Sequence, residues 1–206
     1  MTIDEIMMVA PVIPVLVIDD AAHARPVAEA LVAGGLPVLE VTLRTPAALD
    51  AMREMARVPG AIVGAGTVLN ARDVAACADA GARFIVSPGL TAPLVAAVTE
   101  SGIPFLPGIA TAGDIMRGLD AGLTRFKFFP AETSGGLPAL RALAAPFGMA
   151  RFCPTGGITA ASAPAWLAEP HVKCVGGSWI VPRGAPDGAA IEAAARAASA
   201  LRPAAP

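Results

Sequence analysis

Residues 61–81 read AIVGAGTVLNARDVAACADAG and predict one strand followed by one helix. The short apolar run at 61–68 indicates a buried strand. Asn70 leads into a helix over 71–80, and Gly81 closes that helix, because glycine is the usual residue just past a helix end. This strand–helix unit is the pattern on which the rest of the chain is built.

Eight such units follow one another at a spacing of roughly 25 residues, which is typical of βα repeats. A short helix at about 3–8 precedes them. The predicted strands are 12–18, 38–43, 61–68, 84–87, 104–109, 125–129, 151–154 and 174–180. The predicted helices are 21–33, 46–57, 71–80, 92–100, 112–121, 137–144, 161–168 and 188–201.

Strand alternating with helix predicts an α/β protein with a parallel sheet, and eight units favour a closed (β/α)8 TIM barrel over an open sheet. Since no linker divides the chain, we expect residues 1–206 to form one barrel domain, with a helical segment at 1–10 and a frayed tail at 202–206. The alternative is a dinucleotide-binding fold. It rests on GAG at 64–66, which lacks the third glycine of that fingerprint.

Composition excludes several function classes. The net charge of −2 gives no basic footprint for nucleic acid. The apolar run at 7–18 is too short for a membrane span, and the acidic start of the chain is unlike a signal peptide. The scattered cysteines fit reduced core residues of a cytoplasmic protein: Cys77, Cys153 and Cys174. The 55% apolar content suggests a sheet buried on both faces or contacts between subunits.

One lysine stands inside the aromatic run of the sixth strand, RFKFFPAE at 125–132. Side chains alternate across a strand, so Arg125, Lys127 and Phe129 share one face. An ammonium is costly to bury unless it is paired or neutral, and a neutral lysine amine can form a Schiff base with a carbonyl. The alternative is a lysine that extends to water.

The second strand carries polar groups on the face that would point into a barrel. Alternation places Glu40, Thr42 and Arg44 there, where a barrel core normally holds bulky branched residues. A carboxylate beside a lysine can act as a general base, and an arginine can bind a substrate carboxylate. The alternative is a structural ion pair between Glu40 and Arg44.

Glycine-rich turns follow the last two strands, CPTGGI at 153–158 and GGSW at 176–179. Barrels commonly bind phosphate at this position through backbone N–H groups, which glycine allows an anion to approach closely. Two tight turns without a ligand are the alternative. His23 and His171 have no metal-ligand spacing, so we predict no metal site.

These stretches together resemble the bacterial 2-keto-3-deoxy-6-phosphogluconate (KDPG) aldolase family, also known as 4-hydroxy-2-oxoglutarate (KHG) aldolase. The resemblance runs from about Pro11 to Pro182. Its specific parts are VLEVTLRT at 38–45, GAGTVLN at 64–70, SPG at 87–89, FKFFPAE at 126–132, CPTGGI at 153–158 and GGSW at 176–179. It implies a homotrimeric (β/α)8 enzyme that forms an imine with its substrate and needs no metal or other cofactor.

The resemblance also implies roles for individual residues. Lys127 would be the Schiff-base lysine and Glu40 the general acid and base. The expected substrate-binding residues are Arg44 and Thr67 at the carboxylate, Pro88 and Phe129 in the pocket wall, and Thr155 as the specificity position. The expected phosphate-binding residues are Gly156, Gly157, Gly177 and Ser178. The segment before Pro11 is shorter than in many relatives, so the closure of the barrel bottom is an open question, and 133–134 also depart from the family's pattern.

The leading hypothesis is therefore a lyase that cleaves a small phosphorylated keto-deoxy sugar acid. A stereoisomeric substrate such as the 6-phosphogalactonate is the nearest alternative. The other classes are a phosphosugar isomerase or epimerase and a phosphate-binding scaffold without catalysis. Metal-dependent isomerases would need histidines at strand ends, and the intact Glu40, Arg44 and Lys127 set argues against an inactive scaffold.

Overall fold

Strands and helices alternate along the chain in the computed structural model, which describes residues 1–201; the predicted tail at 202–206 lies outside them. The strands are β1 Val12–Leu16, β2 Val38–Thr42, β3 Ile62–Gly66, β4 Ile85–Val86, β5 Phe105–Leu106, β6 Gly108–Ile109, β7 Arg125–Phe128, β8 Arg151–Phe152 and β9 Val175–Gly177. The helices are α1 Ile3–Val9, α2 Ala24–Ala33, α3 Ala48–Met55, α4 Ala71–Asp79, α5 Ala92–Ser101, α6 Ala112–Asp120, α7 Gly136–Ala144, α8 Ala163–Leu167 and α9 Gly188–Ser199. A 3-10 turn, η1 (Ala21–His23), precedes α2.

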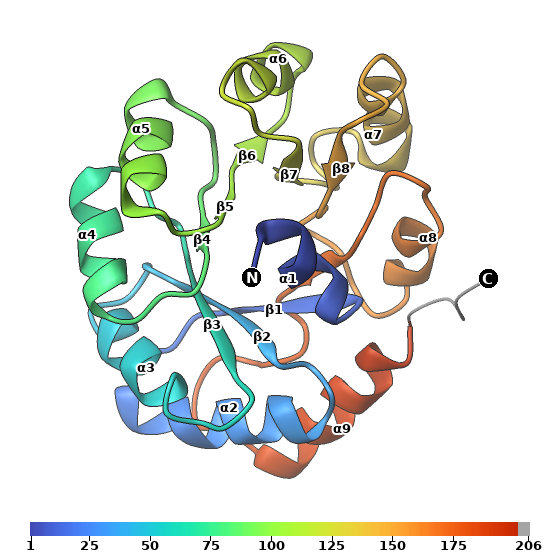
Figure 1. The fold of residues 1–206 in the computed structure, drawn as a ribbon. Helices are drawn as coiled ribbons and strands as arrows, with labels where there is room; N and C mark the ends of the chain where they lie inside the picture. The colour runs from blue at the N-terminus through green and yellow to red at the C-terminus, as the bar shows by residue number, and fades with distance from the viewer. Residues whose placement is uncertain (202–206) are drawn as a thin grey trace.

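The strands form a curled, parallel sheet. One part has the order β5-β4-β3-β2-β1-β9 and the other the order β6-β7-β8. Parallel bridges between Phe152 and Val172 and between Thr155 and Gly176 bring the β8 and β9 segments together. Helices α2 to α9 lie around the outside of the strands, and α1 lies over their middle (Figure 1).

Proline divides the fifth predicted strand. We expected one strand at 104–109, but β5 ends at Leu106 and β6 begins at Gly108. Pro107 between them has no N–H to donate to a ladder. Its carbonyl still accepts from the amide of Lys127 at 2.8 Å, so the two pieces continue along the same path.

The helix predicted at 161–168 is also shorter than expected, because α8 spans only Ala163–Leu167. Pro164 in its first turn suits a helix start. The other predicted elements agree with the structure to within about two residues at most ends, the usual uncertainty of an element boundary.

Apolar side chains fill two layers. The larger lies between the sheet and the outer helices and includes Phe126 and Phe128 from β7. The smaller lies inside the curl of the sheet and includes Phe84, the residue just before β4. The alternation expected for β7 is therefore confirmed, because Phe126 and Phe128 face the helices while Lys127 between them faces the interior.

Helix α1 closes the inner layer at the amino-terminal ends of the strands. Its side chains of Ile6 and Met7 are buried among the inner apolar residues. Thr2 and Glu5 form a capping box that fixes the first turn. The short N-terminal segment is thus long enough to cover this end.

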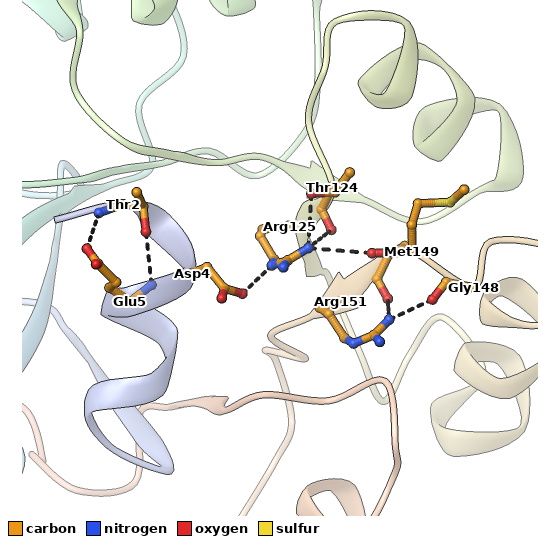
Figure 2. A network of polar contacts seen from close by, with 9 residues as sticks. Thr2, Asp4, Glu5, Thr124, Arg125, Gly148, Met149 and Arg151 are labelled. Carbon is orange, nitrogen blue, oxygen red and sulfur yellow. Dashed lines mark hydrogen bonds and ion pairs between the residues drawn. The ribbon is translucent and has the colours of Figure 1, made fainter.

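An arginine of β7 ties α1 to the strands (Figure 2). Arg125 forms an ion pair with Asp4 of α1, and its guanidinium also donates to the hydroxyl of Thr124 at 2.9 Å. Arg151 lies alongside and donates to the carbonyl of Gly148 at 2.8 Å. Arg125, on the face predicted to point inward, therefore helps to hold α1 over the end of the strands. Lys127, two residues further along the same face, lies deeper.

No helix within residues 1–201 has the length and apolar character that crossing a membrane requires.

Candidate active site

Lys127 and Glu40 form an ion pair inside the curled sheet. The Nζ of Lys127 donates to Oε1 of Glu40 at 2.8 Å, and their side chains are only 7% and 4% exposed. Burying two charges is favourable only with good geometry, and removing one partner costs about 3–5 kcal/mol. The alternative of a lysine that extends to water is wrong, because the amine is held by the carboxylate.

The strand pattern brings these two side chains together from residues 87 positions apart. Lys127 pairs with Gly108 in the ladder and Glu40 pairs with Gly64, so glycines flank both. The ring of Phe129 lies 5.4 Å from Nζ of Lys127, within the range of a cation–π contact. The amine is thus enclosed by a carboxylate and an aromatic ring.

Two glycines of the GAG segment make room for this arrangement. A β-carbon built on Gly66 would overlap the carboxylate of Glu40, and one built on Gly64 would overlap the ring of Phe84. The segment therefore packs against neighbouring strands, and the alternative of a dinucleotide fingerprint is not needed to explain it. Sequence reasoning did not assign Gly66 to the site.

Arg44 and Thr67 lie together just past the ends of β2 and β3. Nε of Arg44 donates to Oγ1 of Thr67 at 3.3 Å. Thr67 has a φ of 61°, a left-handed conformation that non-glycine residues rarely adopt and that is often found at functional sites. The ion pair considered between Glu40 and Arg44 is wrong, since Glu40 pairs with Lys127.

Thr155 and Pro88 border the same interior. Thr155 is buried, and its amide donates to the carbonyl of Phe128, the residue after Lys127, at 2.9 Å. A β-carbon on Gly176 would overlap the Thr155 hydroxyl, so β9 passes close to it. In the same way, a β-carbon built on Gly108, the ladder partner of Lys127, would overlap the carbonyl of Pro88.

The glycine-rich turns after β8 and β9 are neighbours through the Thr155–Gly176 bridge. Gly156 and Gly157 have φ values of 105° and 80°, which favour glycine. Among residues 1–201, the amides of Gly156, Gly157 and Ser178 donate to no protein acceptor. Successive amides in such turns form concavities suited to anions.

Two further features were not predicted. Ser87 is buried, and its hydroxyl donates to the carbonyl of Gly89 at 2.6 Å, which shapes the SPG turn. Glu132, the last residue of the FKFFPAE stretch, accepts a hydrogen bond from the indole of Trp166 at 3.0 Å. Glu132 itself was visible in the sequence as a polar residue after the aromatic run, but its partner on another element was not.

Within residues 1–201 no group of three or more His, Cys, Asp or Glu side chains is placed to hold a metal ion. The site instead offers an amine, a carboxylate, an arginine and a set of backbone amides. An amine in contact with a carboxylate inside a parallel α/β protein is an arrangement suited to the class of enzymes that react with carbonyl compounds through an imine.

Comparison with known proteins gives the family. Residues 3–194 match the KDPG and KHG aldolase family. The chain is 61% identical to the 2-dehydro-3-deoxy-phosphogluconate aldolase of Zymomonas mobilis over 203 residues, which cover 98% of each chain. The chain therefore belongs to the KDPG and KHG aldolase family, whose members are lyases.

Solved structures of related proteins support the same family assignment. The Zymomonas mobilis ZM4 KDPG aldolase, solved with 3-phosphoglycerate, has a TM-score of 0.96 and 60% identity over 97% of this chain and 96% of that one. The Legionella pneumophila KDPG aldolase has a TM-score of 0.93 and 44% identity over 97% and 98% of the two chains. In that structure pyruvate is captured at low pH as a covalent carbinolamine intermediate.

Proposed function

We propose that this chain is a Schiff-base aldolase that cleaves KDPG to pyruvate and glyceraldehyde 3-phosphate. It also cleaves 4-hydroxy-2-oxoglutarate to pyruvate and glyoxylate. The observation that carries the proposal is the buried contact between Nζ of Lys127 and Oε1 of Glu40. Family membership and the carbinolamine of the Legionella relative support it.

The reaction begins with a proton transfer inside the pair. Glu40 takes a proton from the Lys127 ammonium, and the resulting amine attacks the C2 ketone of the substrate. Protonated Glu40 returns its proton to the hydroxyl of the carbinolamine that forms, the hydroxyl leaves as water, and the nitrogen lone pair closes the iminium, so that Glu40 is again a carboxylate. Covalent catalysis of this kind replaces one difficult step by two easier ones.

The iminium then accepts the electrons of the breaking bond. The Glu40 carboxylate removes the C4 hydroxyl proton, the C3–C4 bond breaks, and its electron pair moves to form an enamine on Lys127. The aldehyde product leaves. Glu40 returns a proton to C3, and water hydrolyses the pyruvate imine to restore the amine.

The other residues bind the substrate in this proposal. Arg44 and Thr67 hold the C1 carboxylate, for which an arginine fork is well suited. Phe129 and Pro88 form the pocket wall, and Thr155 contacts the hydroxylated carbons as the specificity position. The contacts that support these roles are the hydrogen bond between Arg44 and Thr67, the Phe129 ring near Lys127, the Thr155 amide bonded to Phe128, and Pro88 against Gly108.

The phosphate lies at the two glycine-rich turns. Amides of Gly156, Gly157, Gly177 and Ser178 donate to its oxygens, at the position where barrels commonly bind phosphate. The bridge that brings together the segments after β8 and at β9, and the 3-phosphoglycerate of the Zymomonas relative, support this assignment.

An assay of pyruvate release tests the function. Purified protein should release pyruvate from KDPG and, with lower efficiency, from 4-hydroxy-2-oxoglutarate, and Lys127→Ala should abolish both activities. Preference for the 6-phosphogalactonate stereoisomer over KDPG would favour the alternative substrate. Pyruvate release by the Lys127→Ala variant would contradict the proposal.

The proposed fold is one (β/α)8 barrel domain spanning the whole chain. Its support is the continuous path of β5 and β6 and the two bridges between the β8 and β9 segments. Closure leaves no free sheet edge. Amide hydrogen exchange tests it, because closure predicts slow exchange at Phe152 and Gly176, whose amides bond to His171 and Pro154.

The proposed assembly is a cytoplasmic homotrimer, as the family resemblance implies. The apolar content of 55% is compatible with subunit contacts, and Cys77 and Cys153 are buried thiols that suit a reducing compartment. Sedimentation equilibrium should give three times the chain mass of 20.6 kDa. A monomer mass at micromolar concentration would contradict the trimer.

A further inference from the structure

Glu132 is the last residue of the FKFFPAE stretch, and the proposed mechanism gives it no role. Two backbone hydrogen bonds join its segment to the turn after β8, from the amide of Ala131 to the carbonyl of Thr155 at 2.8 Å and from the amide of Glu132 to the carbonyl of Gly156 at 3.1 Å. The segment that follows the reactive lysine thus continues beside the glycine-rich turn.

The side chain of Glu132 forms one wall of that turn. A β-carbon built on Gly157 would lie 2.7 Å from both Cβ and Cγ of Glu132. Only a glycine can pack this closely, so the aliphatic stem of Glu132 limits where the Gly156–Gly157 backbone can lie.

The carboxylate of Glu132 points to helix α8. Its Oε1 accepts from Nε1 of Trp166 at 3.0 Å, and Trp166 is only 1% exposed. A buried indole N–H needs an acceptor, and Glu132 supplies it. The Trp166 ring in turn packs on Phe128 with centroids 6.3 Å apart, next to Lys127 in β7.

From these contacts we infer that Glu132 is a positioning residue for the substrate phosphate and that Trp166 holds it in place. The hydrogen bond keeps the carboxylate on the helix side of the turn, so that its charge does not face the phosphate while its stem holds the Gly156–Gly157 amides. This inference rests on the proposed function. It predicts that loss of the hydrogen bond between Glu132 and Trp166 weakens the binding of phosphorylated substrates alone.

Three variants test the arrangement. Glu132→Ala removes stem and acceptor, Trp166→Phe keeps a buried ring but removes the donor, and Glu132→Gln keeps both stem and acceptor. The first two should raise KM for KDPG by about 10- to 100-fold with little change in kcat, because misplaced binding groups cost that much. Glu132→Gln should remain within about threefold of wild type, an amide oxygen being an adequate acceptor.

The comparison substrate is 4-hydroxy-2-oxoglutarate, which has no phosphate. Its KM should not change in any of the three variants, since only a substrate that carries the remote group can use the remote binding energy. The matched control is Glu169→Ala. That carboxylate lies just past α8 and pairs with the exposed Arg141 instead of with Trp166, so both KM values should equal those of wild type.

A second readout does not depend on turnover. The chain has two tryptophans, so the ¹⁵N NMR spectrum should contain two indole N–H signals, and Trp166→Phe identifies one of them. Titration with 3-phosphoglycerate should shift that signal in wild type and in Glu132→Gln.

The outcomes separate the two hypotheses. Wild-type protein that cleaves neither substrate would refute the proposed function. Active wild type with unchanged KDPG KM in Glu132→Ala, or with equal losses on both substrates in Glu132→Ala and Trp166→Phe, would refute the positioning role alone. An indole signal that stays fixed at saturating 3-phosphoglycerate would also refute it.

Discussion

At the scale of single residues, the proposed mechanism divides the chemistry between the two groups in contact, Lys127 and Glu40. In that mechanism the amine forms the covalent bond to the substrate, and the carboxylate accepts and donates the protons. Gly66 allows both to be close, because any side chain there would occupy the volume of the Glu40 carboxylate. Each of these functions can be removed separately.

Glu40→Gln should reduce kcat by about 10²–10⁴-fold, the range expected for loss of a general acid–base group. Glutamine keeps the shape and can still accept a hydrogen bond from Lys127, so substrate binding should change little. Steady-state kinetics on KDPG measure both quantities. A variant with wild-type kcat would assign the proton transfers to another group.

Individual residues also show which features of the site could be predicted from the sequence and which could not. Alternation predicted that Lys127 and Glu40 face the interior, because the period of a strand is fixed by its geometry. It could not predict their contact, since that depends on the register of strands 87 residues apart in the chain. For the same reason, the hydrogen bond between Glu132 and Trp166 could not be predicted from the sequence.

At the scale of elements, helix caps and one proline determine where the strands and helices end. Pro107 interrupts the fifth predicted strand, and Asn70, Thr91 and Thr111 cap the helices that follow β3, β4 and β6. These signals are local, so most elements could be predicted from the sequence. The early end of β4 at Val86 could not, because its length depends on pairing with β3 and β5.

The cap of α6 gives a stability prediction. Burial alone would raise the pKa of the Asp114 carboxyl, but hydrogen bonds from the amide of Ala110 and from the amide and hydroxyl of Thr111 outweigh it and lower the pKa. A lowered folded-state pKa means that the ionised carboxylate stabilises the fold above its unfolded pKa of about 3.9. That contribution is lost as pH falls through the folded value.

Asp114→Asn should therefore lower the free energy of unfolding by about 0.5–2 kcal/mol at pH 7, the usual cost of a weakened cap. The difference from wild type should shrink below pH 4, where the wild-type carboxyl also becomes neutral. Urea unfolding at pH 7 and pH 3 measures both differences. A difference that grows on acidification would contradict the assigned direction of the pKa shift.

Helix α1 is the element that closes the inner layer. Ile6→Ala should lower the free energy of unfolding by about 2–5 kcal/mol, because it leaves a cavity beneath the helix. Met8→Ala on the same helix should cost far less, since Met8 is 44% exposed. Chemical denaturation compares the two, and similar losses would mean that α1 does not pack as described.

At the scale of the whole molecule, the helix α1 closure and the proposed substrate-binding groups lie toward opposite ends of the strands. The amino-terminal ends hold α1, Asp4 and Arg125, whereas the carboxyl ends carry the glycine-rich turns and Arg44. Barrel enzymes generally place their active sites at the carboxyl ends. We therefore expect Ile6→Ala to retain its kcat below its unfolding temperature.

The proposed mechanism also makes a prediction about metal ions. The iminium on Lys127 accepts the electrons of the broken bond, a role that a metal-dependent aldolase assigns to its ion. Dialysis against EDTA should therefore leave kcat and KM for KDPG unchanged. Activity that falls in EDTA and returns with a divalent cation would require a different electron sink.

The most direct test of the account is to trap the covalent intermediate. Borohydride added with pyruvate should reduce the imine to a stable amine, and peptide mass spectrometry should place the adduct on the fragment that contains Lys127. Lys173, the other lysine of the chain, precedes β9 and should remain unmodified. An adduct on Lys173, or no adduct in protein that is active on KDPG, would contradict the central claim that Lys127 forms the Schiff base.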